Sequence, residues 1–181
     1  MDIKKPTVLT EWFRLYRLYQ SAFPASEKKP FSMIRTMQKK GKSDVWYCTD
    51  DGKFAGMVIT INGPDKILLD YLAVAKNRRG QGIGSEMLKK MREQYSGKGV
   101  FLEIEIVDET AENYEERKRR KQFYLSNGMT PMNVFVELFG MDMELLGFDC
   151  QISFDEYHDF YRDNYNAWAA EHVKPMRKNK E

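Results

Sequence analysis

Apolar positions near the start of the chain recur at the spacing of a helix. Residues 10–22, TEWFRLYRLYQSA, place their apolar side chains toward one side, which predicts a helix with Thr10 as its N-cap. The segment FPASEKKPF follows, with prolines that break the helix, and a second short helix is predicted over 31–40, ended by Gly41. The chain is therefore expected to begin with two helices.

The hydrophobic period then changes to that of strands. DVWYCT and FAGMVITI, joined by DDGK, predict a hairpin, because Asp-Gly favours a tight turn. KILLDYLAVA is a nearly continuous apolar run, as expected of a strand covered on both faces. A helix with apolar residues from Ile83 to Tyr95 along one side comes next, and VFLEIEIV then alternates as a strand should.

The last third of the chain predicts a charged helix, two strands and a final helix. The charged helix, roughly 111–126, ends at Asn127-Gly128, and the strands lie near 130–139 and 142–149. Ser153 and Glu156 form a capping box for the last helix, SFDEYHDFYRDNYNAWAAEH. Its apolar side could pack on its own core or on a second subunit, so a homodimer is left open. The side chains on that side are Phe154, Tyr157, Phe160, Tyr161 and Trp168.

These elements predict an α/β fold with a mixed, mostly antiparallel central sheet flanked by helices, and an extra C-terminal helix. We expect a single domain over 1–181, with a core of about 7–149 and a helical extension over 150–181.

Composition narrows the class of protein. The chain is 42% apolar and 31% charged, which is ordinary for a soluble globular protein, and its formal net charge of +2 argues against a nucleic-acid partner. No apolar run is long enough to span a bilayer, and the N-terminus lacks a signal peptide's hydrophobic segment, so we expect a cytoplasmic protein with no membrane partner. Cys48 and Cys150 form no metal-ligand cluster, which predicts reduced structural thiols and no metal.

Three glycines and two arginines crowd the start of the helix that follows KILLDYLAVA, in RRGQGIGSEML, residues 78–88. Amides at a helix start have no intrahelical acceptor and carry the positive end of the helix dipole, and glycine lets an anion approach them closely. The spacing fits neither GxxxxGK[ST] nor GxGxxG, and leaves Arg-x-x-Gly-x-Gly from Arg79 to Gly84. This turn is predicted to bind a phosphate group, with Arg78 and Arg79 at its rim.

The stretch LAVAKNRRGQGIGSEML, residues 72–88, resembles the coenzyme A-binding motif of the GNAT superfamily of N-acetyltransferases, and RKQFYLSNGM, residues 120–129, resembles the superfamily's late helix. The order of elements from about 7 to 149 also matches the GNAT core. The resemblance implies a GNAT fold, acetyl-CoA as co-substrate, and a small-molecule or peptide amine as acceptor. The implied diphosphate contacts are the backbone amides of Arg79, Gly80, Gln81, Gly82, Ile83, Gly84 and Ser85, and the implied pantetheine contacts lie on Leu72, Ala73 and Val74.

Acetyl transfer needs a neutral amine, a stabilised oxyanion and a proton for the departing thiolate. Tyr124 corresponds to the tyrosine that GNAT enzymes place beside the sulfur, and the resemblance makes it the proton donor. The general base is left open among Glu103 and Glu105, which share one face of VFLEIEIV, and Asp70, which interrupts an apolar strand; we favour Glu103. Arg117 stands where the family often has an asparagine, which puts that residue's pantetheine contact in doubt.

Several functional questions stay open. The sequence does not identify the acceptor amine. Lys28 and Lys29 could attract an acidic acceptor or could only increase solubility. The basic run ERKRRKQ, residues 116–122, is interpreted as a solvated helix face, and His158 and His172 as structural residues. Two alternatives remain: a non-catalytic coenzyme A-binding or interaction module, and a different phosphate-containing ligand in the same turn.

Overall fold

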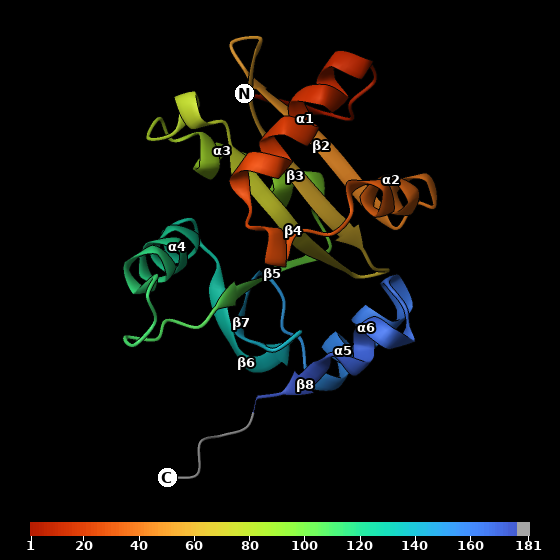
Figure 1. Cartoon of the computed structure of the whole chain (residues 1–181), viewed down its shortest axis with the longest axis vertical. Coiled ribbons are helices and arrows are strands. Elements are labelled where there is room, and N and C mark those ends of the chain that lie inside the picture. The colour runs from red at the N-terminus through yellow and green to blue at the C-terminus, as the bar shows by residue number, and fades with distance from the viewer. Residues whose placement is uncertain (177–181) are drawn as a thin grey trace. The chain divides into compact units, whose positions relative to one another are not determined.

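A computed structural model describes residues 1–176 (Figure 1). The chain divides into two compact units, Met1–Ser96 and Gly97–Glu181, which are described in turn. None of the helices within residues 1–176 is both long and apolar enough to cross a membrane.

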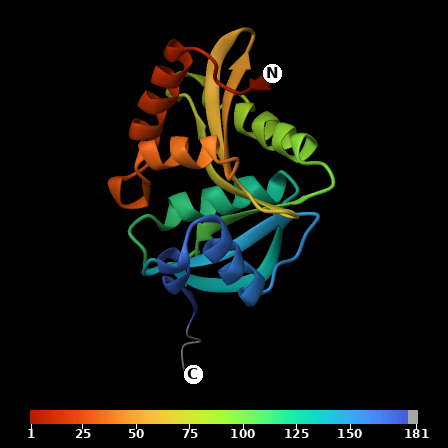
Figure 2. The ribbon, with the colours of Figure 1, turned by 90° about the vertical axis from the view of Figure 1, so that its right-hand side faces the viewer.

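The first unit is a four-stranded antiparallel sheet in the order β1-β2-β3-β4, with three helices. Its elements are β1 (Asp2–Lys4), α1 (Leu9–Ala22), α2 (Phe31–Lys39), β2 (Ser43–Asp50), β3 (Lys53–Asn62), β4 (Lys66–Val74) and α3 (Ile83–Gln94), with single 3₁₀ turns at Ala25–Glu27 and Lys76–Arg78. Figure 2 shows α1 and α2 on one side of these strands and α3 on the other.

Strand alternation builds a core on the α1 side of this sheet. Inward residues of three adjacent strands pack against Leu15 and Tyr19 of α1 and Ile34 of α2. The strand residues in this cluster are Val45, Tyr47, Met57, Ile59, Tyr71 and Ala73. On β3, Gly56 lies opposite Val74, and a Cβ there would come within 2.5 Å of the Ala73 carbonyl oxygen and 2.9 Å of the Met87 sulfur. Glycine therefore lets α3 pack closely on the end of β4.

The start of α1 differs from the prediction. Its N-cap is Val8 and not Thr10, which lies inside the helix. The reason is Glu11, whose Oε2 accepts hydrogen bonds from the backbone amides of Thr7, at 2.8 Å, and Val8, at 3.4 Å. Those bonds satisfy amides before the first turn and so extend the helix toward the N-terminus. Lys4 pairs with the same carboxylate at 2.5 Å, so β1 is tied to α1.

Stability at acid pH should depend on Glu11. The Lys4 ammonium, followed by the Thr7 amide, lowers the pKa of Glu11 from 4.5 to about 2. A lowered carboxyl pKa stabilises the folded state above the unfolded pKa, and this contribution is lost as pH falls through the folded pKa. We expect Glu11→Gln to have a lower melting temperature than the parent near pH 7, and the difference to vanish between pH 4.5 and about 2. A gap of constant size down to pH 2, in melting curves followed by circular dichroism, would contradict this.

The second unit holds the strands β5 (Gly99–Glu105), β6 (Thr130–Leu138), β7 (Met141–Phe148) and β8 (Val173–Pro175), in the antiparallel order β5-β7-β6-β8. Its helices are α4 (Tyr114–Ser126), α5 (Phe154–Asn164) and α6 (Ala167–Glu171). The helix-ending pair is confirmed, since α4 stops at Asn127 and Gly128 has a φ of 89°. The predicted strands near 130–139 and 142–149 are confirmed within one residue at each end.

The C-terminal region is two helices and a strand, and not the single helix predicted. The capping box of Ser153 and Glu156 is confirmed, with Ser153 Oγ accepting from the Glu156 amide at 3.2 Å. The helix stops at Asn164, and the side chain of Asn166 then caps α6 by accepting from the Ala169 amide at 2.8 Å. Because of this break, the residues of α6 no longer continue the apolar side of α5. Trp168, which was predicted on that apolar side, is 60% exposed. Tyr157, Phe160 and Tyr161 are buried within this chain, so these three residues follow the first of the two alternatives, packing on the chain's own core.

The predicted fold class is confirmed: each pairing within the two units is antiparallel, helices pack on the strands, and a helical segment follows the last long strand. The short strands β1 and β8 were not predicted, because three residues are too few to show an alternation. The single-domain organisation stays a prediction.

Candidate functional site

The glycine-rich turn has the backbone geometry of an anion site. After β4 ends at Val74, a 3₁₀ turn leads to Arg79 in extended backbone, and Gly80 and Gly82 then take left-handed φ angles of 73° and 76°. The latter is the N-cap of α3. A Cβ at either glycine would meet no atom within 4 Å, so the positive φ, and not crowding, is what requires glycine there.

The amides of this turn are available to a ligand. The first bond of α3 runs from the Glu86 amide to the Gly82 carbonyl oxygen, at 3.1 Å, and no side chain caps the helix. The amides from Gly82 to Ser85 therefore have no acceptor within residues 1–176. Four such donors at the positive end of a 12-residue helix favour a phosphate group. The geometry predicted for this turn is thus present.

The two arginines of the turn take different roles. Arg79 is exposed, and its Nε donates to the Val74 carbonyl oxygen at 3.3 Å, so its charge stays at the rim as predicted. Arg78 is half-buried and ion-paired with Asp50, which neutralises most of its charge. The prediction of two rim charges is therefore wrong for Arg78, because a carboxylate at the end of β2 was not foreseen as its partner.

Strand β4 leads to this turn and contains a bulge. Tyr71 pairs with Ile59 and Leu69 pairs with Thr60 on β3, so Asp70 is an extra residue without a partner in the ladder. Beyond the bulge the strand pairs regularly, with Leu72 and Val74 half-buried and Ala73 buried. The three residues implied to contact pantetheine thus follow an irregularity that changes the direction of the preceding side chain.

Asp70 is engaged by a lysine of the α1–α2 connection. Both of its carboxylate oxygens contact Lys29 Nζ, at 2.6 and 2.8 Å, and its side chain is 6% exposed. Lys29 therefore does not serve as an exposed charge for an acidic acceptor, which was one of the two roles considered for it. Lys28 is bonded to Gln20 at the surface.

The second unit holds the other predicted residues. Tyr124 is half-buried on α4, with its ring 5.2 Å from that of Phe123, and its hydroxyl forms no hydrogen bond within residues 1–176. Burial raises the pKa of Tyr124 above 10, although Arg120 opposes this, so its phenol carries a proton at neutral pH. A neutral, unengaged phenol is able to donate a proton.

Glu105, one of the three candidate bases, is held by two arginines. Its side chain is 15% exposed and pairs with Arg117, at 2.7 Å, and Arg120, at 3.4 Å. Lys121 pairs in the same way with the buried Glu144 at 2.6 Å. The interpretation of the basic run as a solvated face is therefore wrong for these three residues and holds for Lys118 and Arg119, which are exposed. Arg117, which stands where the family often has an asparagine, forms an ion pair with Glu105.

Glu103 is bound by the C-terminal helix. Its Oε1 accepts hydrogen bonds from the hydroxyls of Tyr157, at 2.6 Å, and Tyr161, at 2.8 Å. The ring of Phe101, two residues earlier on β5, lies 6.2 Å from that of Tyr157. The favoured base is thus a carboxylate that also fixes α5 to β5, an arrangement with no signal in the sequence beyond the capping box.

Loss of one of these phenols should lower stability. Tyr157 is 0% exposed, so Tyr157→Phe deletes a short hydrogen bond to a charged group without changing the packed volume. We expect the free energy of unfolding to fall by about 1–2 kcal/mol in urea titrations. Tyr16→Phe, at a residue that is 45% exposed, is the matched control and should change it by less than about 0.5 kcal/mol. Equal effects would show that the Glu103 bond contributes nothing.

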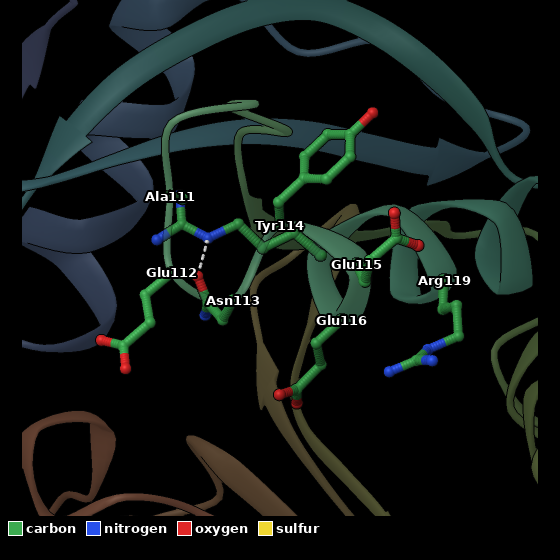
Figure 3. Close-up of a pocket in the computed structure, with 8 residues that line it drawn as sticks. Ala111, Glu112, Asn113, Tyr114, Glu115, Glu116 and Arg119 are labelled. Atoms are coloured by element: carbon green, nitrogen blue, oxygen red, sulfur yellow. Dashed lines mark hydrogen bonds between the residues drawn. The ribbon is translucent and has the colours of Figure 1, made fainter.

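A cavity of about 800 Å³ lies at the start of α4 (Figure 3). Its lining residues are Ala111, Glu112, Asn113, Tyr114, Glu115, Glu116, Arg117 and Arg119. Of its charged groups, Glu116 is paired with Arg120 and Arg117 with Glu105. The remaining two carboxylates and one guanidinium group leave the lining slightly acidic, which disfavours a polyphosphate. His158 and His172, interpreted as structural, lie elsewhere in this unit, and within residues 1–176 no three His, Cys, Asp or Glu side chains are grouped as metal ligands.

Comparison with known proteins agrees with the geometry. Residues 41–130 match the family model described as an acetyltransferase (GNAT) domain. YjbC of Bacillus subtilis (strain 168), which is named as an acetyltransferase, is 32% identical over 104 residues, 58% of this chain and 52% of YjbC. The chain thus spans about half the length of that curated relative.

Solved structures share the fold. A GNAT-family protein of Bacteroides thetaiotaomicron aligns with a TM-score of 0.77 at 17% identity, over 94% of this chain and 99% of its own. An aminoglycoside 6′-N-acetyltransferase solved with coenzyme A gives 0.63 at 16%, over 82% and 96%. The ribosomal-protein-S18-alanine N-acetyltransferase of Escherichia coli gives 0.61 at 16%, over 84% and 95%. At these identities the likeness establishes the fold alone.

Proposed function

Because the chain carries a GNAT acetyltransferase domain and belongs to that superfamily, we propose that it transfers the acetyl group of acetyl-CoA to a primary amine. The observation that supports this most directly is the turn of Gly80 and Gly82, which have positive φ angles and lead into α3, whose first four amides have no acceptor within residues 1–176. We propose that the amides from Arg79 to Ser85 hold the diphosphate, and that Leu72, Ala73 and Val74 contact pantetheine through the backbone of β4.

The proposed chemistry is direct attack of the amine on the thioester. A backbone amide near Leu72–Val74 stabilises the oxyanion, a role that needs no particular side chain. Tyr124 gives a proton to the departing thiolate, in keeping with its raised pKa and with a hydroxyl that has no hydrogen-bond partner in the described part of the chain. No step requires a metal.

Among the three carboxylates, the contacts favour Asp70 as the base over Glu103 and Glu105. Two arginines hold Glu105 and two phenols hold Glu103, and taking up a proton would weaken each of those bonds. Asp70 faces an ammonium group, which is the form in which an aliphatic amine arrives at neutral pH. Pairing with a cation weakens Asp70 as a base just as it weakens Glu105. What favours Asp70 is that its present partner, the Lys29 ammonium, has the same chemical form as the arriving acceptor, which could take the place of Lys29 beside the carboxylate.

The acceptor is proposed as an amine of a small molecule or a peptide. The names of structural neighbours include an aminoglycoside 6′-N-acetyltransferase, a ribosomal-protein-S18-alanine N-acetyltransferase and a spermidine N-acetyltransferase, which span that range. A cytoplasmic setting belongs to the proposal, because cysteines that are not joined in a disulfide, as Cys48 and Cys150 are, suit a reducing compartment. Burial raises the pKa of Cys48 to about 12, so its thiol stays protonated at neutral pH.

An acceptor screen tests the proposal. Purified protein is supplied with acetyl-CoA and a panel of aminoglycosides, polyamines and peptides with free N-termini, and thiol release is followed against samples without amine. We expect release that depends on at least one amine class. Tight acetyl-CoA binding without release for any amine would instead identify a non-catalytic coenzyme-binding module, and preference for ATP over acetyl-CoA in calorimetry would identify a different ligand.

A further inference from the structure

The contact between Lys29 and Asp70 has the chemistry of an amine-binding subsite. A carboxylate with both oxygens within 2.8 Å of Nζ supplies charge and hydrogen bonds. The ring of Tyr71, whose centroid lies 5.3 Å from the same nitrogen, supplies an aromatic partner. Phe23 and Tyr19 pack on Tyr71, at 4.8 and 5.0 Å between ring centroids, and hold that ring in place. A primary ammonium is recognised by these features together.

The backbone of Lys29 is fixed independently of its side chain. Its amide donates to the Tyr71 hydroxyl at 3.2 Å, and its carbonyl oxygen accepts from the Tyr19 hydroxyl at 2.9 Å. The Tyr71 hydroxyl in turn donates to the Glu27 carbonyl oxygen at 2.7 Å. The α1–α2 connection is therefore also held on β4 by hydrogen bonds that do not involve the ion pair, and the Lys29 side chain is 23% exposed.

The position of Asp70 relates this subsite to the coenzyme. The bulge places Asp70 out of the β3 ladder and two residues before Leu72, which is about 7 Å along a strand. Under the proposed function, β4 from Leu72 onward contacts the pantetheine arm. An ammonium bound at Asp70 would thus lie beside the thioester end of the pantetheine arm.

We propose that Asp70 and the ring of Tyr71 form the subsite that binds the ammonium of the acceptor, and that Lys29 is an internal occupant that the acceptor displaces. The inference rests on the proposed function for the reaction that follows, but not for the binding itself. Its ligand class is an aliphatic primary ammonium.

Each proton of the reaction at this subsite has a defined destination. The acceptor ammonium gives one proton to the Asp70 carboxylate, and the freed lone pair forms the C–N bond at the thioester carbon. The C–S bond breaks, the thiolate takes a proton from Tyr124, and the proton lost by the new amide nitrogen restores the phenol. The proton on Asp70 leaves to solvent. Acetyl-CoA and an ammonium thus become an amide, coenzyme A and one proton.

Chemical rescue tests the subsite without requiring turnover. Lys29→Ala removes three methylene groups and the ammonium, a set of atoms that n-propylamine replaces. We expect n-propylamine at tens of millimolar to raise the melting temperature of Lys29→Ala by about 3 °C or more. 1-Propanol should not do so, and neither amine nor alcohol should shift Lys29→Met, whose side chain fills the space, or the double variant Lys29→Ala/Asp70→Asn. No difference between amine and alcohol in folded Lys29→Ala would overturn the subsite.

Two further measurements distinguish a folding defect from a loss of function: the folded fraction in circular dichroism and the formation of an acetylated product. If Lys29→Ala is partly unfolded, its folded fraction in circular dichroism should rise with n-propylamine, since a ligand of the folded state shifts that equilibrium; if it stays unfolded throughout, Lys29→Ser is tested in the same way. With acetyl-CoA present, N-propylacetamide should form. Rescue without this product retains the subsite and overturns acetyl transfer, whereas product from other amines without any rescue retains transfer and overturns the subsite.

Discussion

Gly82→Ala is expected to weaken acetyl-CoA binding by at least about 30-fold, the equivalent of about 2 kcal/mol. At a φ of 76° a Cβ is strained by about 1–2 kcal/mol, so the turn relaxes and its amides lose their common direction. A Cβ there would meet no atom within 4 Å, so the cost comes from the backbone and not from crowding. Isothermal titration calorimetry with acetyl-CoA measures the change.

Gly41→Ala is the matched control for this substitution. Gly41 follows α2, has a φ of 73°, and likewise has no atom within 4 Å of a built Cβ. Both variants should therefore lose a similar amount of stability, and only Gly82→Ala should lose the coenzyme. If both bind acetyl-CoA as the parent does, the diphosphate is not held at this turn, and the assignment of the coenzyme site is wrong. If both lose binding equally, the effect comes from stability alone.

The glycine turn could be predicted because its geometry is local. A positive φ is a property of one residue, and free amides are a property of any helix start, so the residues of one short stretch determine the site. The hairpin turn is a second case, with Asp51 and Gly52 at φ angles of 49° and 69°, as the sequence Asp-Gly predicts.

The partners of the charged groups could not be predicted in this way. Lys29 and Asp70 are 41 residues apart, and Glu103 lies 54 residues from Tyr157, so these contacts exist only once strands and helices have packed. A lysine in a polar loop and a tyrosine on a helix look the same in the sequence whether or not they meet a carboxylate. The sequence places Glu103 on a strand, and a position on a strand does not reveal which side chains bind the carboxylate.

The division of the last helix shows a related limit. Hydrophobic spacing from Phe154 to Trp168 is continuous enough to predict one helix, because periodicity does not register a change of direction. The break depends on Asn166, whose side chain caps a new helix, and an asparagine in mid-pattern is a weak signal by itself. Its consequence is large, since it exposes Trp168 and leaves the chain to form β8.

Tyr124→Phe is expected to lower kcat by about 100-fold while leaving the dissociation constant of acetyl-CoA within about twofold of the parent. The substitution removes only the hydroxyl, which has no hydrogen-bond partner within residues 1–176, and keeps the ring that packs on Phe123. The thiolate must then take its proton from water. Steady-state kinetics with an accepted amine, together with calorimetry, separate the two quantities, and Tyr114→Phe on the same helix is the control.

The pH dependence provides a second test of the same residue. Burial raises the pKa of Tyr124 above its ordinary value of 10, and a proton donor acts only in its protonated form, so its contribution persists through neutral pH and is lost as pH rises through that raised pKa. The parent kcat should therefore decline on the alkaline side only above pH 10, and Tyr124→Phe should lack that decline. An unchanged kcat in Tyr124→Phe would show that another group protonates the thiolate, because the phenol would then be dispensable at every pH.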